Sequence, residues 1–143
     1  MKAIRNTVFL ICAGAIALTS WNARATTAVI PTMDPDFQVS VSPDPIESGQ
    51  PLTVSVTGGK PDAKTFLVYS VNDLYLCAIY VAELKVNVNM CTPHLVPQFQ
   101  KTDAFGNATW TTTAPVVAAS QRIRLQALQY MHSSSVTDVT IEP

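Results

Sequence analysis

The sequence predicts an all-β domain, built as a sandwich or a barrel. Apolar and polar side chains alternate in short runs through most of the chain after residue 36. Clusters of Gly, Pro, Asp, Asn and Ser separate these runs, as in Pro43–Gly49 and Gly58–Asp62. Alternation puts one set of side chains on a core and the other set in water, and regularly spaced turn signals are typical of antiparallel sheets.

Each alternating run is expected to form a strand, and no run favours a helix. The run 65–71 is apolar on both faces, which predicts a central strand that is covered on both sides. The strands are expected over 37–42, 52–58, 65–71, 78–89, 98–102, 108–113, 121–128 and 134–141.

Two of these runs carry a specific expectation about the buried face. Residues 78–89 are expected to form one strand, because strict alternation and β-branched valines outweigh the helix-forming residues among them. Its core face would hold Tyr80, Ala82, Leu84, Val86 and Val88. In the run 121–128, the core face would hold Ile123, Leu125 and Ala127, and the face in water Arg122, Arg124 and Gln126.

The first 25 residues have the pattern of a secretory signal. Lys2 and Arg5 form a short positive region, and 7–18 is nearly continuous apolar sequence. That length suits the core of a signal peptide and is too short for a comfortable membrane span. Ala23 and Ala25 supply small residues at the −3 and −1 positions of a cleavage site. We predict cleavage after Ala25, with an uncleaved N-terminal anchor as the alternative.

Cleavage would leave 118 residues, enough for one domain with a single core. Six basic and ten acidic side chains would remain, a formal charge of −4 without a basic cluster, so nucleic acid is not an expected partner. No later apolar run has the length of a membrane span, and the mature chain is expected to be soluble or held at a surface by a partner. Residues 26–36 contain two prolines and no clear period, and are expected to form an extended N-terminal arm.

Two cysteines remain in the mature chain, Cys77 and Cys91. An even number of cysteines in a secreted protein predicts a disulfide, and only one pairing is possible here. The bridge would close a loop of about 15 residues and stabilise the fold by roughly 3 kcal/mol in the chain-entropy model. Free thiols or metal ligands are the alternative, which an oxidising compartment disfavours.

The stretch DAFGNATW, residues 103–110, predicts a tight turn followed by a strand. The Asp103 side chain can accept a hydrogen bond from the backbone two residues on, and Gly106 and Asn107 tolerate positive φ. A hairpin is expected, with Trp110 as a large core residue and threonines on the solvated face. Asn107-Ala-Thr also matches the N-glycosylation pattern, but its role in the turn already explains the asparagine.

Three segments together resemble the immunoglobulin-like modules of bacterial secreted and cell-surface proteins. They are ESGQPLTVSVTGGKPDAKTFLVYS at 47–70, KTDAFGNATWTTTAP at 101–115, and IRLQALQY with SSSVTDVTI at 123–141. The resemblance covers most of 37–143 and implies an immunoglobulin-like antiparallel β-sandwich of about seven to eight strands. It carries over no catalytic residues. Cys77 and Cys91 depart from the antibody pattern, because they are close in sequence and would staple a loop or an edge strand.

The sequence contains no motif of a known active site. Serine-hydrolase, zinc-protease and phosphate-loop patterns are absent, so no catalytic residue, cofactor or metal is predicted. His94 and His132 are expected at the surface or in turns. Four acidic residues motivate a calcium hypothesis, although plain turns explain them equally: Asp34, Asp36, Asp44 and Glu47. The tyrosines are expected to pack rather than to bind a ligand: Tyr69, Tyr75, Tyr80 and Tyr130.

Three functions are compatible with this pattern. The favoured hypothesis is a secreted, non-enzymatic module that binds a protein or carbohydrate at the cell surface, in adhesion, matrix or envelope assembly. Its loops 72–78 and 89–97, which flank the predicted disulfide, are the first candidates for the binding surface. The second hypothesis is a structural subunit of a fibre or surface array, which would assemble by adding the arm 26–36 to the sheet of a neighbour. A small secreted hydrolase is the third.

Overall fold

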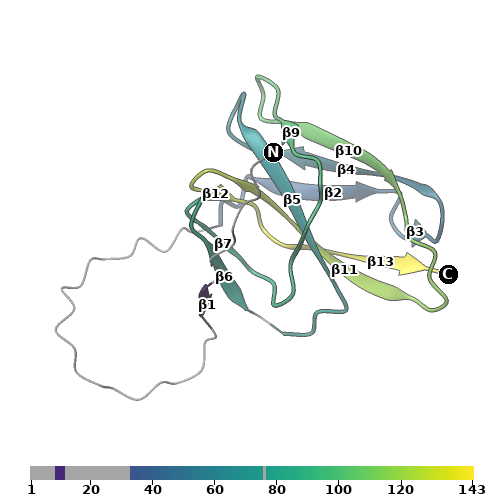
Figure 1. Ribbon diagram of the computed structural model, residues 1–143. Helices are drawn as coiled ribbons and strands as arrows, with labels where there is room; N and C mark the ends of the chain where they lie inside the picture. The colour runs from purple at the N-terminus through teal and green to yellow at the C-terminus, as the bar shows by residue number, and fades with distance from the viewer. Residues whose placement is uncertain (1–8, 12–32, 76) are drawn as a thin grey trace, which may run out of the picture.

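The computed structural model describes residues 9–11 and 33–143, except residue 76. The described chain is all-β (Figure 1), and no helix long and apolar enough to cross a bilayer occurs in it. The strands are β1 (Phe9–Ile11), β2 (Gln38–Ser42), β3 (Ile46–Glu47), β4 (Pro51–Thr57), β5 (Lys64–Val71), β6 (Ala78–Val81), β7 (Val86–Val88), β8 (His94–Leu95), β9 (Gln100–Lys101), β10 (Ala108–Thr113), β11 (Gln121–Gln129), β12 (His132–Ser133) and β13 (Thr137–Glu142).

Two sheets face each other across the main core. The smaller sheet has three antiparallel strands in the order β10-β4-β2. The larger sheet follows the order β3-β13-β11-β5-β8, and within it β3 pairs with β13 in parallel. Apolar side chains of both sheets form one buried cluster that includes Val54 and Trp110 from the smaller sheet and Leu125 and Ile141 from the larger. The alternation expected from the sequence is confirmed for the longer strands of these two sheets, because each of them turns one face to this core.

A third layer covers the outer face of the larger sheet. The hairpin β6-β7 packs there with a second apolar cluster that contains Ile79, Val86 and Met90, together with Val68 of β5 and Leu128 of β11. The expectation of a central strand at 65–71 is confirmed, because β5 has buried side chains on both of its faces. The expectation that Gln126 faces water is wrong, because this third layer buries it completely.

The single strand expected over 78–89 is wrong, because the chain reverses in the middle of it. β6 ends at Val81 and β7 begins at Val86, with a turn between them. The Leu84 amide donates to the Val81 carbonyl at 3.2 Å, and Lys85 has a φ of 54°. Because of the reversal, the buried side chains differ from the expected set. Ile79, expected on the face opposite to Val86 and Val88, is buried together with them.

The turn at DAFGN has the predicted chemistry but connects different strands than expected. The Asp103 side chain accepts hydrogen bonds from the amides of Phe105 at 2.8 Å and Asn107 at 2.9 Å. The Asn107 amide, with further help from Phe105, holds the pKa of the Asp103 carboxyl below its ordinary value. The expected hairpin is wrong, because β9 pairs with β5 whereas β10 pairs with β4. The turn thus carries the chain from the larger sheet to the smaller one, and its role is to shape the fold.

Two buried glutamines bind loops to the larger sheet. The Gln126 side chain accepts from the Asn89 amide at 2.9 Å and donates to the Ser134 carbonyl at 3.0 Å. The Gln129 side chain accepts from the Lys60 amide at 2.7 Å and donates to the Thr65 hydroxyl at 2.8 Å. Each amide therefore has partners for both its oxygen and its nitrogen, which removes most of the cost of burying it.

The described end of the N-terminal arm is anchored to the sandwich. The Asp34 amide donates to the Ser133 carbonyl at 3.0 Å, and Asp34 forms a parallel bridge with Ser134. His132 stacks on the buried ring of Phe37 with 4.7 Å between ring centroids. The rest of the arm, residues 26–32, lies outside the described residues.

Most of the predicted signal, and the predicted cleavage site at Ala25, also lie outside the described residues. The exception is β1, which falls in the apolar core of that signal and pairs with the outer edge of β6. The two facing sheets themselves are built from strands that follow residue 36.

Replacing Gly106 by alanine tests the contact that locks the turn to the neighbouring loop. Gly106 has a φ of 80°, and an added Cβ would lie 2.0 Å from the Gly59 carbonyl oxygen. Gly49→Ala is a matched control, since Gly49 has a φ of 73° but its Cβ would meet only Val116 at 3.6 Å. We expect Gly49→Ala to lower the free energy of unfolding by about 1–2 kcal/mol, the cost of positive φ. Gly106→Ala should lower the free energy of unfolding by about 1–3 kcal/mol more than Gly49→Ala does, because the added Cβ would clash with the Gly59 carbonyl. Urea denaturation of both variants measures the difference. Equal losses of unfolding free energy in the two variants would contradict the close contact between Gly106 and Gly59.

Candidate functional site

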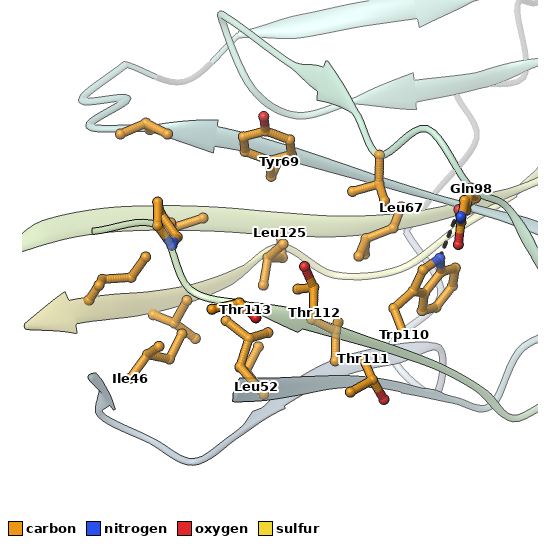
Figure 2. A pocket seen from close by; sticks show the side chains of 18 of the residues that line it. Ile46, Leu52, Leu67, Tyr69, Gln98, Trp110, Thr111, Thr112, Thr113 and Leu125 are labelled. Carbon is orange, nitrogen blue, oxygen red and sulfur yellow. Dashed lines mark hydrogen bonds between the residues drawn. The ribbon is translucent and has the colours of Figure 1, made fainter. Parts of the chain in front are cut away.

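An apolar cleft lies between the two sheets of the described chain. It has a volume of about 610 Å³, within the range of about 300–1,000 Å³ that is usual for ligand pockets. Aliphatic side chains from both sheets form its floor, among them Leu52, Leu67, Leu125 and Ile141, and all four are buried. Figure 2 shows Leu52, Leu67 and Leu125 converging on the space between β10 and β5.

The mouth of the cleft lies between β10 on one side and β5 with the segment 96–98 on the other. The exposed lining residues are found at these places, among them Val71, Pro97 and Thr112. β10 is the last strand of its sheet, whereas β5 continues to β8 in the larger sheet. The smaller sheet therefore stops before it covers the whole inner face of the larger one, and the uncovered part is the cleft.

Trp110 stands at one end of the cleft and ties its two sides together. Its side chain lies on the inner face of β10 and is 5% exposed. The indole Nε1–H donates to the Gln98 carbonyl at 2.8 Å, which holds the segment 96–98 against β10 (Figure 2). The predicted core role of Trp110 is confirmed, and it also lines the cleft. The only other tryptophan of the sequence is Trp21, inside the predicted signal, so Trp110 would be the sole tryptophan of a chain cleaved after Ala25.

The lining of the cleft is suited to binding rather than to acid–base chemistry. It contains no Asp, Glu, His, Lys, Arg or Cys, and Tyr69 is its one ionisable side chain. The polar groups at the rim are neutral, chiefly the threonine hydroxyls of β10 and the Gln98 side chain. General acid–base catalysis needs a proton donor or acceptor with a pKa near the working pH, and this lining does not offer a pair of such groups.

The predicted disulfide joins Cys77 to Cys91, with 4.8 Å between their Cα atoms. It closes the base of the β6-β7 hairpin, so it staples the third layer, as the departure from the antibody pattern implied. The loops that flank it have different surroundings. Loop 89–97 contributes Val96 and Pro97 to the cleft, whereas loop 72–78 exposes Leu74 and Tyr75 to solvent.

Asp73 organises the loop beside the disulfide. Its carboxylate accepts hydrogen bonds from the amides of Cys91 at 2.6 Å and Tyr75 at 3.3 Å. Burial acts to raise the pKa of this carboxyl, but the backbone amides of Cys91, Tyr75 and Thr92, and then the charge of Arg124, outweigh it and lower the pKa. Arg124 in turn donates to the Tyr75 carbonyl at 3.0 Å and pairs with Asp138 at 3.1 Å. Sequence analysis missed this network, because its members lie far apart in the chain.

The other residues considered from the sequence do not form a second site. No group of three or more His, Cys, Asp or Glu side chains within the described ranges could hold a metal ion. His94 is exposed beside the ring of Tyr69, and His132 is half-buried with its Nε2 3.5 Å from Asp34. The expectation that all four tyrosines pack is wrong for Tyr75 and Tyr130, which are 74% and 51% exposed.

Comparison with known proteins gives little guidance. No family model matches the chain, and no curated protein is significantly similar to it. Among solved structures, it is similar to Pseudomonas fluorescens alkylpurine DNA glycosylase AlkC bound to DNA containing an abasic site analog, with 7% sequence identity and a TM-score of 0.36. The similarity covers 76% of this chain and 31% of that one. A likeness this weak carries no inference about function.

The Asp73 network predicts a pH-dependent contribution to stability. A carboxyl whose pKa is lowered by folding stabilises the fold above its unfolded pKa of about 3.9, and this contribution is lost as the pH falls through the folded pKa. Asp73→Asn should therefore lower the free energy of unfolding most at neutral pH, and the difference from the wild type should shrink towards about pH 3. Urea denaturation across this range measures it, with Asp44→Asn at an exposed turn as the control. If Asp73→Asn lowered the free energy of unfolding by the same amount at every pH, the negative charge of Asp73 would have no role in stability.

Proposed function

We propose that this protein is a secreted, non-enzymatic interaction module with an immunoglobulin-like sandwich, which binds an apolar segment of a partner protein in the cleft between its sheets. The observation that carries the proposal is the cleft itself, because core-type aliphatic side chains line it and one side of it is open. An open apolar cleft is typical of ligand and peptide sites.

The strand order supports the immunoglobulin-like assignment. Without the two-residue strands, the elements after residue 36 are seven in chain order when the β6-β7 hairpin is counted as one: β2, β4, β5, the β6-β7 hairpin, β10, β11 and β13. The first, second and fifth of these form one sheet, and the third, sixth and seventh form the other. Immunoglobulin sandwiches have the same division, with strands A, B and E in one sheet and C, F and G in the other. The fourth strand, D, would pair with E in that fold, but here the chain makes the β6-β7 hairpin on the outer face instead.

The N-terminal signal pattern and the disulfide support secretion. Residues 1–25 have the charge, apolar length and small-residue spacing of a cleaved leader. The Cys77–Cys91 bridge is consistent with an extracellular location, because disulfides persist in oxidising compartments.

The chemistry of the cleft favours a protein segment over a carbohydrate, and binding over hydrolysis. Sugars are recognised through many hydrogen bonds, whereas the polar groups here are confined to the rim. An apolar side chain that enters the cleft would gain about 25 cal/mol for each Å² removed from water. A hydrolase would need a nucleophile or an acid–base pair, which the lining does not supply.

A neutral apolar fluorophore tests the cleft directly. N-phenyl-1-naphthylamine should bind a chain that starts at Met33 and so lacks residues 26–32, the wild type of this test, at one site. It should quench Trp110 by energy transfer, because Trp110 borders the cleft. Thr112 is exposed on the same face of β10 as Trp110, so Thr112→Phe should fill the mouth and weaken binding about ten-fold or more. Thr109→Phe, on the opposite face, is the matched control and should leave binding unchanged. Equal binding to both variants, or no saturable binding to the wild type, would rule out the cleft as the site.

A further inference from the structure

We infer that the partner of the cleft is a second copy of this chain, which donates residues 26–32 as an extended strand along the free edge of β10. The inference rests on the proposed role of the cleft and names its occupant. It assigns the protein to head-to-tail self-assembly.

The outer edge of β10 is available for pairing beyond Trp110, where the indole holds the segment 96–98 against the strand, in contrast to the opposite edge of its sheet. β10 pairs with β4 along its whole length, and in the described chain no strand pairs with its other edge. At the opposite edge, β2 is tied to the larger sheet, since the Thr137 hydroxyl donates to the Val39 carbonyl at 2.7 Å. The amide of Ser135 likewise donates to the carbonyl of Phe37 at 3.3 Å, just before β2. An edge strand with unpaired backbone groups is a template for another strand.

The free edge also borders the apolar cleft, so one added strand would both pair with the backbone of β10 and fill the cleft. Its backbone would pair with β10, and alternate side chains would point inwards over Leu67 and Leu125. This is the place of strand D in the immunoglobulin-like order, which the β6-β7 hairpin leaves empty. The added strand would therefore widen the smaller sheet until it covers the larger one.

The arm of another copy has the composition and the length for this role. Residues 26–32 are TTAVIPT, with no charged side chain, and the cleft lining is uncharged as well. The first acidic residue of the arm is Asp34, which is already bound to the body of its own domain. The seven residues 26–32 span about 23 Å when extended, against about 20 Å for the six residues of β10.

A second copy is a better donor than the chain itself. The arm leaves its own domain beside β12 and the start of β2, and β4 separates β2 from β10. To pair with its own β10, the arm would first have to pass the end of β4. Donation from one copy to the next is a heterologous contact, which repeats into filaments or rings.

Two complementary variants test this assembly. The donor-only chain carries Thr112→Phe, which fills the cleft and keeps the arm. The acceptor-only chain starts at Met33, which keeps the cleft and removes the arm. The unmodified chain cleaved after Ala25 should form concentration-dependent assemblies in light scattering and electron microscopy. Each variant alone should remain monomeric, and an equimolar mixture should give a one-to-one complex. Thr109→Phe is the control and should assemble like the unmodified chain.

The outcomes separate this inference from the proposed function. Assembly by the acceptor-only chain, or a mixture that stays monomeric, would overturn the donated strand. A monomeric unmodified chain would overturn it as well, including the case in which the arm folds back onto its own β10. If the acceptor-only chain still binds N-phenyl-1-naphthylamine in those cases, the cleft keeps its proposed role with a different partner. If it does not bind the fluorophore, the proposed function fails too.

Discussion

The unequal width of the two facing sheets is the constraint on which the rest of the structure depends. Three strands face a sheet whose main path has five, so part of the larger sheet has nothing opposite it. The side chains there are still those of a core, because Leu67 and Leu125 belong to the central strands β5 and β11. Both side chains are nevertheless buried in the single domain, Leu67 2% and Leu125 6% exposed, and the exposed lining residues of the cleft lie at its rim. The cleft and the free edge of β10 both follow from this unequal width of the two sheets.

The outer face of the larger sheet is covered by a segment that lies between the two sheets in chain order. Between β5 and β10 the chain forms the β6-β7 hairpin, which packs on the outer face of β5 and β11 and is closed by Cys77–Cys91. Burial of that face also removes the side-chain amides of Gln126 and Gln129 from water. Both amides find hydrogen-bond partners in neighbouring loops. The disulfide matters here because a short hairpin with a small apolar cluster is marginal without a covalent staple.

Local chemistry was predictable from the sequence, whereas the pairing of distant segments was not. The alternating runs located most strands, and Asp103 and Gly106 form the turn that their residue types predict. The even number of cysteines after the predicted signal, Cys77 and Cys91, sufficed to predict the bridge. The reversal between Val81 and Val86 was missed, because alternation continues through the turn and Lys85 is an unusual residue at positive φ. The connection of the DAFGN turn to two different sheets depends on contacts far along the chain, which a local pattern does not contain.

The cleft itself was beyond sequence analysis for the same reason. Its lining residues have the types and spacing of ordinary core residues, and Trp110 was expected to be one of them. Only the strand order shows that β10 has no neighbour on one side and that the space beside it is open. The loops around the disulfide were the first candidates from the sequence, and loop 89–97 does contribute to the cleft through Val96 and Pro97.

The central claim is that the outer edge of β10 is open in a single domain and closed by a donated strand. Amide hydrogen exchange measured by NMR, residue by residue, tests this most directly. In a chain that lacks residues 26–32, the amides of β10 that point away from β4 should exchange rapidly, while those of β4, which lies between two strands, stay protected. On binding a donor chain, the outward amides of β10 should become protected. Full protection of β10 in the isolated domain, or no change on adding the donor, would contradict the account.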